Sequence, residues 1–162
     1  MKERVLVAGI GNIFLGDDGF GSEVASALAA EGLPAHVRLV DYGIRGMHLA
    51  YDLLDGFAAL VLVDAIPGEQ RPGAVHVLEI TEEHLETHGG LDAHGMHPGA
   101  VLASCRMLGG RLPRTFLVGC RPERISEGIG LSAPVAQAVP TALAAIRSLL
   151  EHELADLAAT AG

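Results

Sequence analysis

The chain has few cysteines and few basic side chains, and each shortage excludes a class of protein. Its two cysteines, Cys105 and Cys120, are too few for a disulfide framework and indicate a reducing compartment. Eleven lysines and arginines stand against 20 aspartates and glutamates, which gives a formal net charge of -9. Because this charge would repel a phosphate backbone, nucleic acid is not expected as a partner.

A long apolar segment is also missing from the sequence. No uninterrupted apolar run approaches the roughly 20 residues that cross a bilayer. The opening Met-Lys-Glu-Arg is followed directly by a short strand-like run, where a secretion signal would have its apolar core. We therefore expect a cytoplasmic protein with no membrane partner. The 162 residues, 49% of them hydrophobic, predict a single domain over 1–162.

The first glycine-rich loop lacks the residues with which such loops bind nucleotides. From Gly11 to Gly16 the spacing is that of a phosphate-binding loop, but Asp17 and Asp18 follow where Lys and Ser or Thr are required. Phe14 occupies the third glycine position of the dinucleotide fingerprint. Two carboxylates at this point would repel a nucleotide phosphate, and they favour a metal ion or a peptide backbone as the ligand.

Strand-like and helix-like segments alternate along the chain. Strands are predicted at 4–10, 37–42, 58–65, 74–80 and 115–119, and helices at 19–31, 46–54, 97–108 and 133–157. The last helix is expected to kink or restart at Pro140, and 74–80 alternates like a half-buried edge strand. This order predicts an α/β fold: a three-layer sandwich with a mainly parallel five-stranded sheet and helices on both faces.

Three residues are predicted to meet at the carboxyl ends of the strands, where ligands of such sheets bind. Asp18 follows the first strand and Asp64 ends the third, so their carboxylates face one crevice if these strands are neighbours. His94 lies in a glycine-rich loop, 89–98, that leads into a helix and can fold over the crevice. Two carboxylates and an imidazole suit a divalent transition metal, with positions left open for water or substrate.

Each of these residues also has a purely structural interpretation. Asp17 and Asp18 can cap the helix that begins near Gly19, and Asp17 is the better candidate for capping alone. Asp64 directly follows an apolar run, where a charge is costly to bury without a partner, and this favours a functional role. His94 taken by itself is an ordinary loop histidine.

Four motifs occur in order over most of the chain. They are Gly9-Ile-Gly-Asn-x-x-x-Gly-Asp-Asp-Gly-x-Gly21, Asp41-x-Gly43-x-x-Gly46, Val63-Asp64-Ala65 and His94-Gly95-Met96. In combination they resemble the motifs of the hydrogenase maturation proteases. The resemblance implies an α/β endopeptidase that removes the carboxyl-terminal extension of a nickel-iron hydrogenase large-subunit precursor. It also implies that nickel already held by this precursor is the recognition element for cleavage.

The resemblance further implies roles for single residues. Mapped by motif, Asp18, Asp64 and His94 bind the metal and carry the catalysis. Asp41 and Gly43 are candidates for substrate contact, and Asp41 is equally suited to forming a turn. Nickel would arrive with the substrate, so the free enzyme is expected to be metal-free. Two questions stay open: which of the adjacent aspartates, 17 or 18, faces the crevice, and whether the histidine at 97 adds a ligand.

Two chemical routes and two further functions are compatible with these residues. A metal can polarise the peptide carbonyl or activate a bound water, or a carboxylate can act as general base without metal activation. A serine or cysteine protease is disfavoured, because the nucleophile-elbow pattern is missing and neither cysteine has a recognisable partner. The alternative functions are a non-catalytic, nickel-dependent docking factor for hydrogenase maturation and a hydrolase of small amides or peptides.

Overall fold

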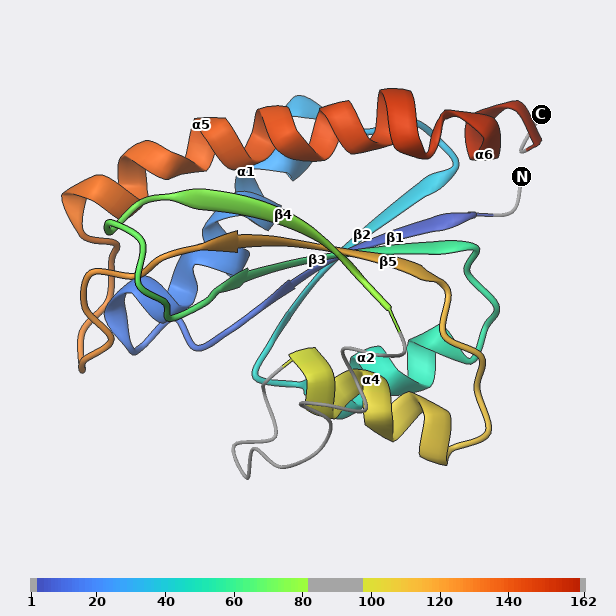
Figure 1. Ribbon diagram of the computed structural model, residues 1–162, viewed down its shortest axis with the longest axis horizontal. Coiled ribbons are helices and arrows are strands. Elements are labelled where there is room, and N and C mark those ends of the chain that lie inside the picture. The colour runs from blue at the N-terminus through green and yellow to red at the C-terminus, as the bar shows by residue number, and fades with distance from the viewer. Residues whose placement is uncertain (1–2, 82–97, 161–162) are drawn as a thin grey trace.

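A computed structural model describes residues 3–81 and 98–160 of the chain (Figure 1). Its strands are β1 (Val5–Ile10), β2 (Val37–Gly43), β3 (Ala59–Ala65), β4 (Val75–Ile80) and β5 (Arg114–Cys120). Its helices are the short 3-10 helix η1 (Gly16–Gly19), α1 (Phe20–Glu31), α2 (Gly46–Leu53), α4 (Pro98–Met107), α5 (Ala133–Ser148), the π-helical segment η2 (Leu149–Glu153) and α6 (Ala155–Thr160).

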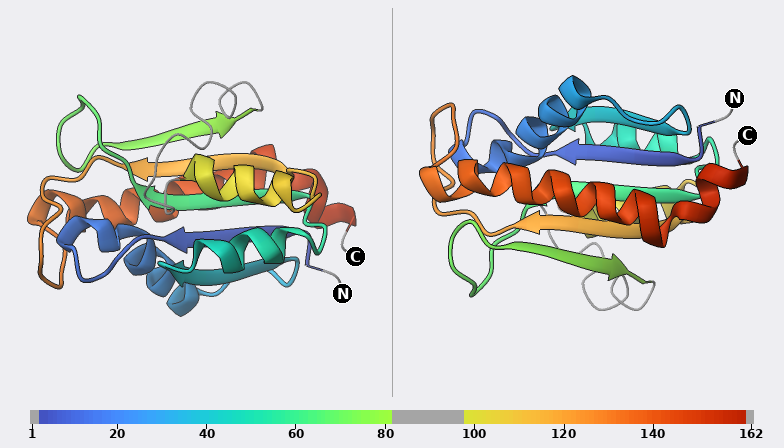
Figure 2. Two further views of the ribbon diagram at one scale, coloured as in Figure 1. Left: turned by 90° about the horizontal axis from the view of Figure 1, so that it is seen from below. Right: turned by 90° about the horizontal axis from the view of Figure 1, so that it is seen from above.

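The five strands form one sheet in the order β2-β1-β3-β5-β4. All neighbours pair in parallel except β4, which runs antiparallel to β5 at the edge of the sheet. Helices cover both faces of the sheet, as Figures 1 and 2 show. The predicted three-layer α/β fold with a mainly parallel five-stranded sheet is therefore confirmed.

Alternate residues of the central strands supply two separate cores. Val61 of β3 packs with Ile146 of α5 on the face that α1 and α5 cover. Leu60, the preceding residue, packs with Leu102 of α4 on the face that α2 and α4 cover. Every residue of β1 and β3 is buried, as expected for strands that are covered on both faces.

Gly21 allows the first turn of α1 to lie directly on the strand ends. A Cβ atom at this position would collide with the carbonyl oxygens of Ile10 and Val63. A Cβ atom on Gly9 would lie only 2.5 Å from the carbonyl oxygen of Gly21. The glycines of the first motif therefore let the helix and the strands approach backbone to backbone at this end of the sheet.

Two details of the predicted fold are wrong. The predicted restart at Pro140 is wrong, since α5 continues through this proline with Ala138 and Ala142 buried in the core, and the interruption comes later, at η2. The strand β4 is not half-buried by alternation, since its four central residues, 76–79, are all exposed. It is the edge strand, and the helices are centred over its neighbours (Figure 2).

Within the described ranges, one helical stretch, Ala133–Glu153, is long and apolar enough to cross a membrane by length and composition alone. The stretch contains Arg147 and Glu151, so it is not an uninterrupted apolar run of the kind that is missing from the sequence. Ala142 and Ile146 of the same stretch are buried in the core beneath it. Because core helices of globular domains meet the same criterion, the stretch is weak evidence for a membrane span.

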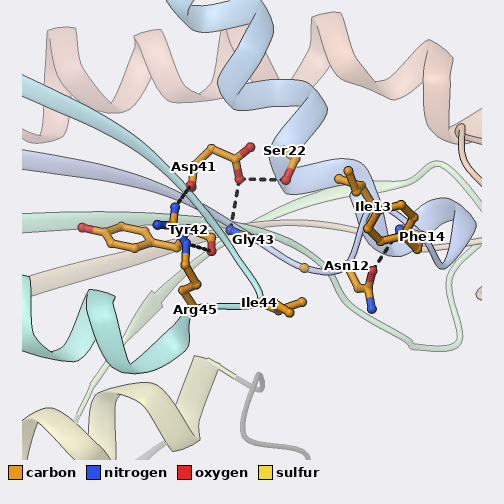
Figure 3. Close-up of a pocket in the computed structure, with 10 residues that line it drawn as sticks. Asn12, Ile13, Phe14, Ser22, Asp41, Tyr42, Gly43, Ile44 and Arg45 are labelled. Carbon is orange, nitrogen blue, oxygen red and sulfur yellow. Dashed lines mark hydrogen bonds between the residues drawn. The ribbon is translucent and has the colours of Figure 1, made fainter.

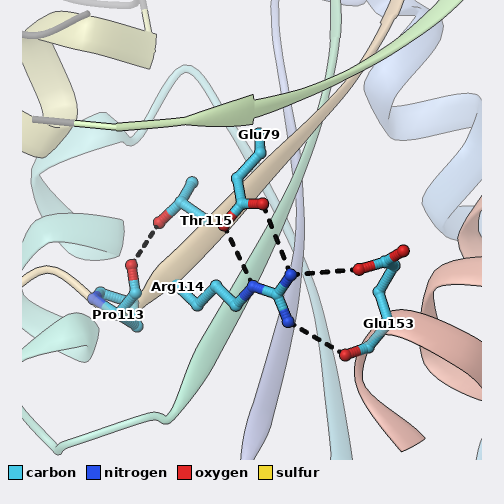
Figure 4. A network of polar contacts seen from close by, with 5 residues as sticks. All are labelled: Glu79, Pro113, Arg114, Thr115 and Glu153. Carbon is cyan, nitrogen blue, oxygen red and sulfur yellow. Dashed lines mark hydrogen bonds and ion pairs between the residues drawn. The ribbon is translucent and has the colours of Figure 1, made fainter. Parts of the chain in front are cut away.

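A charged network joins η2 to the edge of the sheet (Figure 4). The guanidinium of Arg114, at the start of β5, lies 3.0 Å from the carboxylate of Glu79 and 3.1 Å from that of Glu153. It also lies 5.0 Å from the ring centroid of Phe116. The charged side chains of Arg114, Glu79 and Glu153 are 43% to 56% exposed, so each ion pair contributes at most about 1 kcal/mol. The network lies at the amino end of β5, opposite the predicted site.

Candidate functional site

The carboxyl ends of β1 and β3 lie side by side, as the predicted site requires. The two strands pair in parallel with Gly9 opposite Val63. β1 has β2 on its other side, so the chain leaves β1 at the point where the strand order reverses. Asp18 lies in η1, directly after this strand, and Asp64 is the last residue but one of β3.

Asp18 and Asp64 come together around Gly11. This glycine has a φ of +131°, and a Cβ atom on it would collide with the carbonyl oxygen of Asp18 and lie 3.5 Å from Oδ1 of Asp64. The amide of Asn12 donates to Oδ2 of Asp18 at 2.7 Å, and the amide of Ala65 donates to Oδ1 of Asp64 at 2.8 Å. Among the described residues, nothing donates to the second oxygen of either carboxylate.

Asp64 lies in a poorly solvated position within reach of the negative charge of Asp18. Asp64 is only 6% exposed. Burial raises the pKa of Asp64 well above its ordinary value, and the negative charge of Asp18 raises it further, while the hydrogen bond from Ala65 offsets this in part. A cation placed between the two side chains would favour their charged forms, and carboxylate oxygens are suitable ligands for one.

The third predicted ligand, His94, lies outside the described residues, and so does His97. In the ranges 3–81 and 98–160, no group of three or more His, Cys, Asp or Glu side chains is placed to hold a metal ion. Metal binding by Asp18 and Asp64 therefore stays a prediction, and so does the contribution of His94.

Asp17 makes different contacts from Asp18, although the two residues are adjacent. Its side chain is 1% exposed, and its carboxylate accepts four hydrogen bonds of 2.7 to 2.9 Å. The donors are the amides of Glu123, Arg124 and Ser132 and the hydroxyl of Ser132. Burial acts to raise the pKa of Asp17, but these hydrogen bonds outweigh it, and the pKa lies below its ordinary value.

These contacts correct the capping interpretation of both aspartates. The N-cap residue of α1 is Gly19, and no side chain forms a capping hydrogen bond there. Asp17 instead fastens a distant loop, and Asp18 is the carboxylate whose charge acts on Asp64. Sequence analysis missed Ser132 because no motif or spacing links it to Asp17, 115 residues away.

Asp41 and Gly43 lie beside the two carboxylates, at the end of β2, and line a pocket of about 390 Å³ (Figure 3). Oδ1 of Asp41 accepts hydrogen bonds from the hydroxyl of Ser22, at 2.7 Å, and from the amide of Gly43, at 3.1 Å. Asp41 therefore holds the turn after β2 against α1. The pocket includes Gly11, the glycine that contacts Asp18 and Asp64, but neither aspartate lines it. Its remaining walls are formed by Asn12, Ile13, Phe14, Ser22, Tyr42, Ile44 and Arg45.

The two cysteines are packing residues, as predicted. Cys105 and Cys120 are both buried and unpaired. Burial raises the pKa of the Cys105 thiol, and burial together with the charge of Asp17 raises that of Cys120 to about 11. Neither is suited to act as a nucleophile near neutral pH, because the reactive form of a cysteine is the thiolate.

The chain is similar in sequence and in structure to several known proteins. A family model described as hydrogenase maturation protease matches residues 22–149. The hydrogenase 2 maturation protease of Escherichia coli is 33% identical over 156 residues, which cover 95% of this chain and 90% of that protein. The hydrogenase expression/formation protein HupD of Rhodobacter capsulatus is 33% identical over 153 residues, 91% of this chain and 71% of that protein. The solved structure of the hydrogenase maturating endopeptidase HybD from E. coli matches with a TM-score of 0.79 and 30% identity over 93% of both chains.

Proposed function

Because this chain belongs to the hydrogenase maturation protease family, we propose that it removes the carboxyl-terminal extension from a nickel-loaded nickel-iron hydrogenase large-subunit precursor. Membership of the family makes the chain a hydrogenase maturation endopeptidase, a hydrolase. The resemblance found in its motifs is thereby confirmed. Our proposal adds that the precursor is the substrate and that the nickel it carries is the recognition element.

One observation carries this proposal: the convergence of Asp18 and Asp64 at the point where the strand order reverses. Asp64 is buried beside a second negative charge, and a cation brought by the substrate would relieve that repulsion. Carboxylates, joined by the imidazole of His94, suit nickel, which would arrive as part of the substrate. Recognition of this kind acts as a checkpoint, since a precursor without nickel lacks the anchoring contact.

The protein's own residues can be given roles in the hydrolysis. Water must lose a proton as it attacks the scissile carbonyl carbon, and the leaving amine must gain one when the C–N bond breaks. One carboxylate of the pair, Asp64 or Asp18, can accept the first proton and return it as the second. Asp41 and Gly43 line the neighbouring pocket, where they would contact the extended segment of the substrate.

The test is incubation of the purified protein with nickel-loaded precursor, followed by the intact mass of the large subunit. We expect loss of the extension with the unaltered protein and with Asp55→Asn, a control at an exposed aspartate after α2, and no loss with Asp64→Asn. An unchanged mass despite complex formation would favour the docking factor over the protease. Equal cleavage of nickel-free precursor would show that nickel is not the recognition element.

A further inference from the structure

The loop between β5 and α5 is hydrogen-bonded to the loop that carries Asp18. Three backbone hydrogen bonds join them: the amide of Asp17 donates to Arg124, the amide of Gly16 donates to Gly128, and the amide of Gly128 donates to Phe14. The carboxylate of Asp17 adds its four contacts to the same loop. In Figures 1 and 2 the two loops lie side by side at the carboxyl end of the sheet.

These two hydrogen-bonded loops carry four large apolar side chains in exposed positions. Ile129 is 78% exposed, Phe14 61%, Ile125 45% and Ile13 44%. We call these four residues the docking rim. Single exposed apolar residues are ordinary on a protein surface, but a group on two cross-linked loops beside a candidate active site indicates an interaction surface.

We propose that the docking rim binds an apolar surface on the folded body of the substrate protein, next to the segment that is cleaved. This inference rests on the proposed function. Phe14 lies in the same loop as Asp18 and lines the pocket next to the two carboxylates. A protein that brings its chain to Asp18 therefore also passes Phe14, and Gly128, next to Ile129, is hydrogen-bonded to Phe14.

The charge of the chain favours this occupant over a second copy. Each copy has a formal net charge of -9, so two copies repel each other, and a copy seated on the rim would close the crevice to substrate. The hydrogen bonds of Asp17 hold the rim in place before binding, which lowers the entropy that must be lost when the partner arrives.

The test compares cleavage of nickel-loaded precursor by Ile129→Ser, by Phe14→Ser and by the double variant. The control is Met107→Ser, which also removes an exposed apolar side chain, 88% exposed, at the end of α4. Each rim variant is expected to raise KM by roughly tenfold, and the double variant by up to about a hundredfold, with kcat retained. The control should leave both constants unchanged.

Three results would overturn the inference while leaving the proposed function standing. They are an unchanged KM in the double variant, a loss of kcat without a change in KM, and a dimer in gel filtration that the rim variants dissociate. The last result would show that the rim joins two copies of this chain. Failure of the unaltered protein to cleave nickel-loaded precursor is a separate outcome, because it would refute the proposed function and the rim together.

Discussion

Replacing Asp64 by asparagine is expected to stabilise the protein while abolishing cleavage. The side chain of Asp64 is buried beside Asp18, and both effects raise its pKa in the folded state above the ordinary value of 3.8 that the unfolded chain has. Between these two values the folded protein holds one proton more than the unfolded chain. The free energy of unfolding therefore falls as pH rises through that window.

The size of this effect follows from the linkage relation. Within the window, Asp64 lowers the free energy of unfolding by up to about 1.4 kcal/mol for each pH unit. Asparagine keeps an oxygen that can accept the amide of Ala65 but has no charge to desolvate. For a domain of this size, about 1.4 kcal/mol corresponds to a Tm difference of roughly 3 to 6 °C. The variant should match the unaltered protein below pH 3.8 and become progressively more stable above it.

The assay is thermal or urea unfolding of both proteins from pH 3 to pH 8, with Asp55→Asn as the matched control for removing one negative charge. The advantage of Asp64→Asn over this control should grow with pH. The same difference at every pH, or a variant less stable than the unaltered protein at neutral pH, would refute the account of Asp64 as a destabilised carboxylate. Such a stability gain at the cost of function is common at active sites.

Three further variants test other parts of the site. Asp18→Asn should abolish cleavage of nickel-loaded precursor with a change in unfolding free energy of at most about 1 kcal/mol, and retained activity would show that the wrong carboxylate was assigned. Asp17→Asn should destabilise the protein by roughly 2 to 4 kcal/mol near neutral pH, because the NH2 group of the new asparagine would face buried groups that donate hydrogen bonds to the aspartate. Since the pKa of Asp17 is lowered in the folded state, this cost should shrink in urea unfolding as pH falls below 3.8. Gly21→Ala should cost roughly 3 kcal/mol or prevent folding, because its methyl group meets two carbonyl oxygens, and an unchanged Tm would contradict the close packing of α1.

The layered fold and the pair of carboxylates were predictable from the sequence because local patterns determine them. Alternating apolar segments indicate strands and helices, and right-handed connections between parallel strands leave few arrangements. Once β1 and β3 are neighbours, Asp18 and Asp64 must end at the same edge of the sheet. Gly11 then allows the backbone of Asp18 to approach closely, and this role could be recognised only in the structure.

The features that sequence analysis missed depend on contacts between distant parts of the chain. The carboxylate of Asp17 meets Ser132 across 115 residues, and nothing local marks either residue as a partner. Pro140 was expected to interrupt its helix on local grounds, but burial of the surrounding helix face outweighs one lost hydrogen bond. The exposure of β4 likewise depends on where the helices lie over the sheet, and its own alternating pattern does not reveal that position.

We propose that Asp18, Asp64 and His94 bind the nickel carried by the substrate. X-ray absorption at the nickel edge measures this directly, on nickel-loaded precursor alone and on the precursor frozen with the protein. We expect additional oxygen and nitrogen neighbours of nickel when the unaltered protein is present, and fewer of them with Asp64→Asn or His94→Ala. A nickel spectrum that is the same with and without the protein would contradict it.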